Sequence, residues 1–192
     1  MTRGEILDAL DGRVAGGQPD EQDEAKVWIA TFLASVEDNE KLVDIDWNVT
    51  IPSKNSSAKQ FHFPPLTPEQ LSVGRKPWFI ILSGGKMGKD EFVQTFMHEL
   101  AHVYYEDDGI IPPEIKEPQH WQPIIEVRAD LQMEKWGALR SKFKADTYTH
   151  CDKKQWERYF PNSMSQEEAL EFAKIGNTDQ IITQYKNKYP IK

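Results

Sequence analysis

Residues 78–105 read WFIILSGGKMGKDEFVQTFMHELAHVYY, and this stretch decides the predicted fold. It begins with a continuous apolar run, which predicts a strand over 78–82 that is buried or faces a cleft. A glycine-rich turn follows, and the acidic Asp90 and Glu91 are typical of a helix start. Apolar residues then recur at helical spacing: Phe92, Phe96, Leu100 and Val103. The sequence therefore predicts an amphipathic helix that runs from about residue 89 to Tyr105.

This predicted helix carries the motif HExxH at residues 98–102. Residues four apart on a helix lie one turn apart on the same face, so His98 and His102 can share one metal ion. Imidazole nitrogens at about 2.0–2.1 Å are typical zinc ligands. Glu99 lies beside the first ligand, where it can take a proton from water and deliver it to a leaving amine. The motif would occur by chance about 0.01 times in such a chain, so it predicts a zinc site.

A catalytic zinc needs a third protein ligand, and a second long helix predicted over about 119–143 offers one. Within it, Glu126 and Asp130 lie one turn apart in the sequence EVRAD. Glu126 would complete a His₂Glu ligand set, and Asp130 would accept the outer N–H of a ligand histidine. His120 is the alternative third ligand, because it also follows the motif.

Peptide hydrolysis at such a site also needs a hydrogen-bond donor to the developing oxyanion. Tyr104, Tyr105 and His120 are candidates because they lie close to the motif in the sequence, although a tyrosine after such a helix is commonly packed. His62 and His150 are isolated in the sequence, and a surface or packed position explains each of them better than a ligand role.

The segments before residue 78 are predicted to be a helix, a strand and a long loop. Residues 1–18 are rich in glycine and polar groups and are expected to be loose. A helix is predicted from about 20 to 37, and the alternation over 43–51 predicts a half-buried strand that Pro52 ends. Residues 53–77 are expected to be a long irregular loop, in which 61–63 could form a short strand; such a length is common in binding loops, and simple mobility is the alternative.

The C-terminal part, residues 145–192, is expected to be a helical extension of two or three helices. One of them is predicted to begin at Ser165, whose side chain can cap a helix that has acidic residues in its first turn. A length of 192 residues and a mass of 22.2 kDa suit one compact domain, so a single domain over 1–192 is expected.

The charge balance is acidic, with 23 Lys and Arg against 31 Asp and Glu and a net charge of −8. Direct nucleic-acid binding needs clustered positive charge, so this balance argues against it. No apolar run is long enough to cross a membrane. Residues 1–11 lack the apolar core of a signal peptide, and the single Cys151 cannot form an internal disulfide. A cytoplasmic location is therefore expected, and secretion as an effector stays open.

The strand, the turn and the HExxH helix of residues 78–105 resemble the core of the ImmA/IrrE-type zinc metallopeptidases. A later helix of that family carries E-x-x-A-[ND], which Glu126, Ala129 and Asp130 match. The wider gluzincin pattern, HExxH followed by ExxxD, is met equally well. The resemblance covers about residues 42–137 and implies an α+β, minimal zincin-like fold, in which helices pack on a small, mostly antiparallel sheet.

The resemblance also implies the roles of the site residues: His98, His102 and Glu126 as ligands of Zn²⁺, and Glu99 as general base. The expected activity is hydrolysis of a peptide bond in a protein substrate, which would pair with strand 78–82 as an added edge strand. Such enzymes often act on one protein partner, so a regulatory protein partner is also considered. The alternative is a catalytically silent zincin-fold protein that binds a partner, although the intact Glu99 counts against it.

Overall fold

The computed structural model of the protein describes most of the chain: residues 1–51, 78–82, 88–107, 110–137 and 147–190. These residues divide into two compact units, Met1–Tyr104 and Tyr105–Lys192. The described segments form eight α-helices, one 3₁₀ helix and a three-stranded sheet, which confirms the predicted α+β class. The expected single domain over 1–192 stays a prediction. The predicted strand at 61–63, His62 and the rest of loop 53–77 lie outside the described residues.

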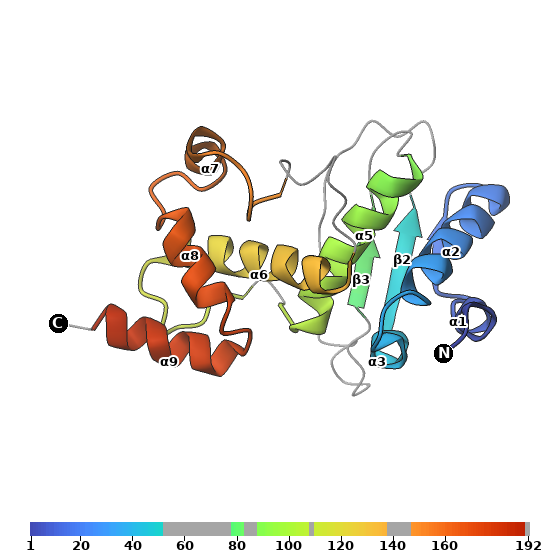
Figure 1. The fold of residues 1–192 in the computed structure, drawn as a ribbon, viewed down its shortest axis with the longest axis horizontal. Coiled ribbons are helices and arrows are strands. Elements are labelled where there is room, and N and C mark those ends of the chain that lie inside the picture. The colour runs from blue at the N-terminus through green and yellow to red at the C-terminus, as the bar shows by residue number, and fades with distance from the viewer. Residues whose placement is uncertain (52–77, 83–87, 108–109, 138–146, 191–192) are drawn as a thin grey trace. The chain divides into compact units, whose positions relative to one another are not determined.

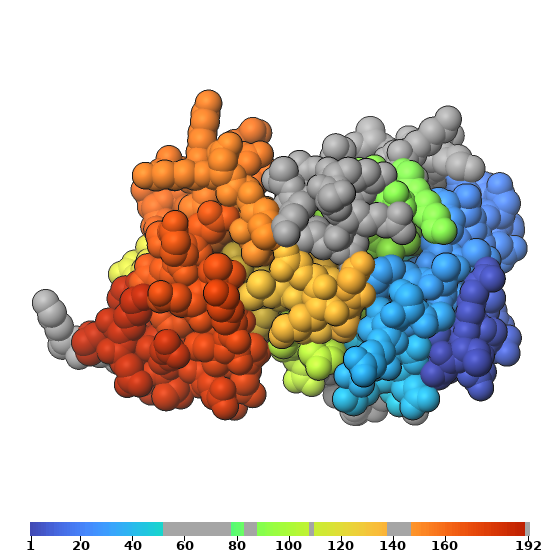
Figure 2. All heavy atoms as spheres, viewed as in Figure 1, coloured from blue at the N-terminus to red at the C-terminus, as the bar shows by residue number. Residues whose placement is uncertain are grey.

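The first unit combines four helices with the sheet (Figure 1). Its elements, in chain order, are α1 (Arg3–Ala9), β1 (Val14–Gly16), α2 (Pro19–Leu33), α3 (Asn39–Asp44), β2 (Trp47–Ile51), β3 (Trp78–Ile81) and α5 (Lys89–Tyr104). Residues 1–18, expected to be loose, instead contain α1 and β1. Ile6 and Leu10 are fully buried, and the Met1 amine donates to Asn39 Oδ1 at 2.9 Å. In Figure 2 the N-terminal atoms lie directly against those of α3.

The sheet has the order β1-β2-β3, and both strand pairs are parallel, so the predicted mostly antiparallel sheet is wrong. The register places Val49 of β2 beside Val14 on one side and Ile80 on the other. The chain passes from β1 to β2 through α2 and α3, and a helical crossover of this kind returns the next strand in the same direction. The antiparallel arrangement was implied by the family resemblance alone, because apolar alternation indicates which face of a strand is buried and carries no information about strand direction.

Strand β2 begins at Trp47, whereas the alternation predicted a strand from residue 43. Val43 is instead buried in the last turn of α3. The guanidinium of Arg13 donates to the carbonyl oxygens of Val43 at 2.8 Å and Ile45 at 3.0 Å, and so satisfies carbonyl groups at the end of this helix. The Arg13 bond to Val43 joins residues 30 positions apart, so no local pattern could reveal it.

The buried face of the sheet holds α5 in place. Trp47 of β2 is fully buried and packs edge-on against Phe96 of α5, with ring centroids 5.3 Å apart. Trp28 of α2 contacts Phe92 of α5 at the same centroid distance, 5.3 Å. Since aromatic pairs of this geometry are worth about 0.5–1.5 kcal/mol beyond their burial, α5 is anchored on its apolar side by both the sheet and α2. The helix predicted from residue 89 to Tyr105 is thereby confirmed as α5, Lys89–Tyr104.

Replacing Gly16 with Ala is expected to destabilise the first unit by about 2 kcal/mol or more. Gly16 adopts a φ of +79°, and an added Cβ would lie 2.2 Å from the carbonyl oxygen of Ile51 on the neighbouring strand. Gly12→Ala is the matched control, because Gly12 has a φ of +74° but nothing within 4 Å of an added Cβ. Urea denaturation should show the larger loss for Gly16→Ala, and equal losses would contradict the clash.

The second unit is helical throughout its described residues. Its elements are the 3₁₀ helix η1 (Pro118–His120) and the helices α6 (Trp121–Lys135), α7 (Lys153–Tyr159), α8 (Gln166–Ala173) and α9 (Thr178–Lys188). The three last helices confirm the predicted C-terminal extension, and Ser165 caps α8 by accepting from the backbone N–H of Glu168. Helix α6 ends earlier than predicted, because Gly137 directly follows its cap with a φ of +72°.

The core of the second unit lies mainly between α6 and α8, which pack against each other (Figure 1). Trp121 and Ile124 of α6 are buried together with Phe172 of α8 and Tyr185 of α9. In none of the described helices is there a stretch both long and apolar enough for a bilayer crossing.

Candidate metal centre

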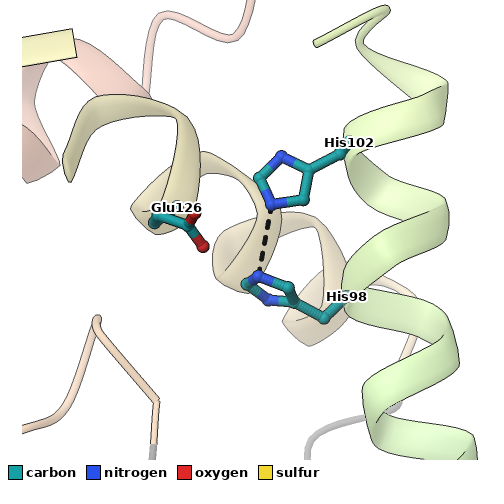
Figure 3. Close-up of side chains that lie close together, drawn as sticks. All are labelled: His98, His102 and Glu126. Atoms are coloured by element: carbon teal, nitrogen blue, oxygen red, sulfur yellow. Dashed lines mark hydrogen bonds between the residues drawn. The ribbon is translucent and has the colours of Figure 1, made fainter. Parts of the chain in front are cut away.

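The two histidines of the HExxH motif lie on one face of α5 with their rings turned toward each other. The Nε2 atoms of His98 and His102 are 3.2 Å apart, and the ring planes meet at 81° (Figure 3). Two ligands at about 2.0–2.1 Å from a tetrahedral ion lie about 3.3 Å apart, so the observed distance suits a shared metal. Both side chains come from one helix, one turn apart on the same face, so no tertiary contact is needed to make the two rings neighbours.

Glu126 of α6 completes a group that could hold a metal ion. One ligand atom each from His98, His102 and Glu126 lies within 4.8 Å of the others. Figure 3 shows the Glu126 carboxylate directed toward the two imidazoles. Two imidazole nitrogens and one carboxylate oxygen form a donor set that zinc accepts, and three protein ligands leave a position for water or substrate. The group that the sequence predicted is therefore present, with Glu126 as its third member.

Glu99 lies next to His98 on α5, and only 8% of it is exposed. Among the described residues it does not belong to the group of ligand atoms. Glu99 is thus a buried carboxylate adjacent in sequence to a residue of this group, and its role as general base stays a prediction.

Asp130 is almost fully buried on α6, with 1% exposure. Its Oδ2 accepts from the backbone N–H of Thr149 at 3.1 Å and from the Thr149 hydroxyl at 3.3 Å. Asp130 therefore ties the turn around Thr149 to α6. The predicted bond from a ligand histidine to Asp130 stays a prediction.

The two tyrosines after the motif differ in environment. The Tyr105 hydroxyl donates to Gln132 Oε1 at 2.8 Å, and the guanidinium of Arg128 lies 4.5 Å from the centre of its ring. The phenolic proton of Tyr105 is thus directed to Gln132. Tyr104 is 40% exposed, and its role as oxyanion donor stays a prediction.

His120, the alternative third ligand, lies in an aromatic cluster of the second unit. Its Nδ1 is 3.0 Å from the Tyr185 hydroxyl, and its ring centroid is 5.3 Å from that of Tyr189. Burial raises the pKa of Tyr185, and burial together with a hydrogen bond to Glu168 raises the pKa of Tyr189. Both phenols therefore stay neutral near pH 7. These contacts assign His120 to packing, and the structure places Glu126, not His120, with the two motif histidines.

His150 is exposed and pairs with Glu134 of α6. This agrees with the expected surface position.

Two buried charged residues were missed by the sequence reasoning. Arg128 is fully buried on α6 and pairs with Asp107, which is 8% exposed. Arg128 also donates to the Gly176 carbonyl at 3.1 Å and to the Thr178 hydroxyl at 3.0 Å. The local sequence shows only that Arg128 lies between Glu126 and Asp130, the acidic pair of the predicted second helix.

The strand, the HExxH helix and the later acidic pair suggested a resemblance to ImmA/IrrE-type peptidases, and that family assignment stays a prediction. Comparisons of this chain with known protein families, with curated proteins and with solved structures gave no match.

Proposed function

We propose that the protein is a zinc-dependent metallopeptidase that hydrolyses a peptide bond in a protein substrate. The observation that carries the proposal is the convergence of His98, His102 and Glu126, whose ligand atoms lie within 4.8 Å of one another. His₂Glu is a ligand set of catalytic zinc, which keeps one position open, whereas structural zinc sites are closed by four protein ligands. The same convergence supports the ligand assignment that the gluzincin-like pattern, HExxH followed by ExxxD, implies.

The proposed reaction assigns separate roles to the metal, to Glu99 and to Tyr104. When bound, Zn²⁺ supplies Lewis acidity, which polarises the scissile carbonyl and makes water a stronger acid. Glu99 takes a proton from the attacking water and delivers it to the leaving amine. Tyr104, which is partly exposed after the motif, is the candidate donor to the oxyanion.

The substrate is proposed to bind as an extended peptide along β3. In the described sheet β3 is an edge strand, with β2 on one side only. An extended chain can add to such an edge through main-chain hydrogen bonds.

A cytoplasmic location is part of the same proposal, because the single Cys151 of the sequence cannot form an internal disulfide.

Replacing Glu126 with Ala is expected to weaken zinc binding more than about 100-fold, since losing even a hydrogen-bond partner of a ligand typically costs 10–100-fold. The measurement is zinc content by elemental analysis, followed by titration against a competing chelator. Glu134→Ala is the matched control, because Glu134 also lies on α6 but pairs with His150. If Glu126→Ala bound zinc as tightly as the wild type and His120→Ala did not bind it, His120 and not Glu126 would be the third ligand.

A further inference from the structure

The carboxylate of Glu126 has a hydrogen-bond partner on its own helix. Gln122 lies one turn earlier on α6, and its side-chain amide Nε2 donates to Glu126 Oε1. Side chains four residues apart on a helix are neighbours on one face, so the backbone of α6 alone brings the two groups together. The sequence analysis did not single out Gln122.

The bond between Gln122 and Glu126 lies at the surface of α6, so it contributes little to the hydrophobic core of the second unit. Gln122 is exposed, and Glu126 is half-buried. A pair of this kind on a helix surface contributes little to stability. The terminal torsion of a glutamate is broad, so a hydrogen bond to one oxygen of the Glu126 carboxylate narrows the orientations that this group adopts. The main effect of the Gln122 amide is therefore to restrict the direction of that carboxylate.

The chemistry of the amide suits a metal ligand. A carboxylate offers about four lone-pair directions on two oxygens, so one N–H bond on Oε1 fixes the group without exhausting its capacity as a ligand. The amide of Gln122 is neutral. Unlike a lysine or arginine, it orients the carboxylate without cancelling the negative charge that attracts a cation.

We propose that Gln122 is a positioning residue, which holds the Glu126 carboxylate in the orientation that binds the metal. This inference rests on the proposed function, because it assigns Glu126 to the metal site. Gln122 acts through Glu126 and has no contact of its own with substrate in this assignment.

The test replaces Gln122 with Met, which keeps the length of the side chain but lacks an N–H donor. Zn²⁺ affinity of the purified full chain, measured against a chelator, is expected to fall about 10–100-fold. The visible spectrum of the Co²⁺-loaded chain is also expected to change, because a rotated carboxylate alters the coordination of the ion. A role in stability alone would leave that spectrum unchanged.

Gln119→Met is the matched control. Gln119 is also exposed, and its Nε2 donates to Glu117 Oε2 at 2.8 Å, but Glu117 is not in the ligand group of the described residues. Equal Zn²⁺ affinity and equal Co²⁺ spectra for Gln122→Met and the wild type would overturn the inference while the proposed function stands. A wild-type chain that binds neither ion would overturn both.

Discussion

Replacing Glu99 with Gln is expected to abolish peptide hydrolysis while the chain still binds zinc. The amide has the size and shape of the carboxylate, so it fits the buried position, where only 8% of Glu99 is exposed. It cannot accept a proton from water at neutral pH, and a positioned general base typically contributes about 10²–10⁴-fold to the rate. Zinc is retained because Glu99 lies outside the group His98, His102 and Glu126.

The measurement compares new protein N-termini in a cell lysate treated with the wild type and with Glu99→Gln. The wild type should generate N-termini that the variant does not, at equal zinc content. Glu91→Gln is the control, since Glu91 is an exposed carboxylate on the same helix, α5. Identical cleavage by wild type and Glu99→Gln would remove Glu99 from its role as base. Zinc-loaded wild type without any cleavage would favour the silent, partner-binding alternative.

The motif residues could be predicted because their geometry is local. Four residues of helix place His98 and His102 one turn apart, and the amphipathic pattern identifies the helix that carries them. Glu126 was harder to predict, because its meeting with the histidines depends on tertiary structure. The acidic pair on the second helix made Glu126 the preferred third ligand, but His120 remained an alternative. Only the contacts of His120 with Tyr185 and Tyr189 showed that its ring belongs to the packing of the second unit.

The errors in the fold have a common physical cause, which is dependence on contacts far apart in the sequence. The parallel direction of β1 and β2 follows from the crossover through α2 and α3, and apolar alternation does not record it. The strand β1 has three residues and ends in Gly16, so it has too few side chains to show a period. Val43 lies in the last turn of α3 instead of a strand, and its carbonyl accepts from Arg13, which lies 30 residues earlier in the chain.

Arg128 was missed for the same reason, and it joins three parts of the second unit. Its guanidinium pairs with Asp107, donates to the Gly176 carbonyl and the Thr178 hydroxyl, and lies over the ring of Tyr105. Arg128, in the middle of α6, therefore links this helix to the segment after α5 and to the turn before α9. A buried charge is costly unless it is paired. Removal of Arg128 or of Asp107 therefore takes away the attraction that offsets the desolvation cost of the other residue.

Replacing Arg128 with Met is expected to destabilise the second unit by about 3–5 kcal/mol, because the buried Asp107 carboxylate loses the guanidinium that pairs with it. Asp107→Leu should cost a similar amount. Urea denaturation, with hydrogen exchange of the amides in α6, α8 and α9, measures both losses. Arg158→Met is the control, since Arg158 is an exposed arginine on α7 and should change stability by less than about 0.5 kcal/mol.

The double variant distinguishes a charge effect from lost packing. In Arg128→Met with Asp107→Leu no charge of the pair remains, so the double variant should be more stable than the sum of the two single losses predicts. The difference should reach about 1–3 kcal/mol, which is the range of coupling energies between residues in contact. Strictly additive losses would mean that Arg128 stabilises the unit through its bonds to Gly176 and Thr178 and its stacking on Tyr105, and not through its pairing with Asp107.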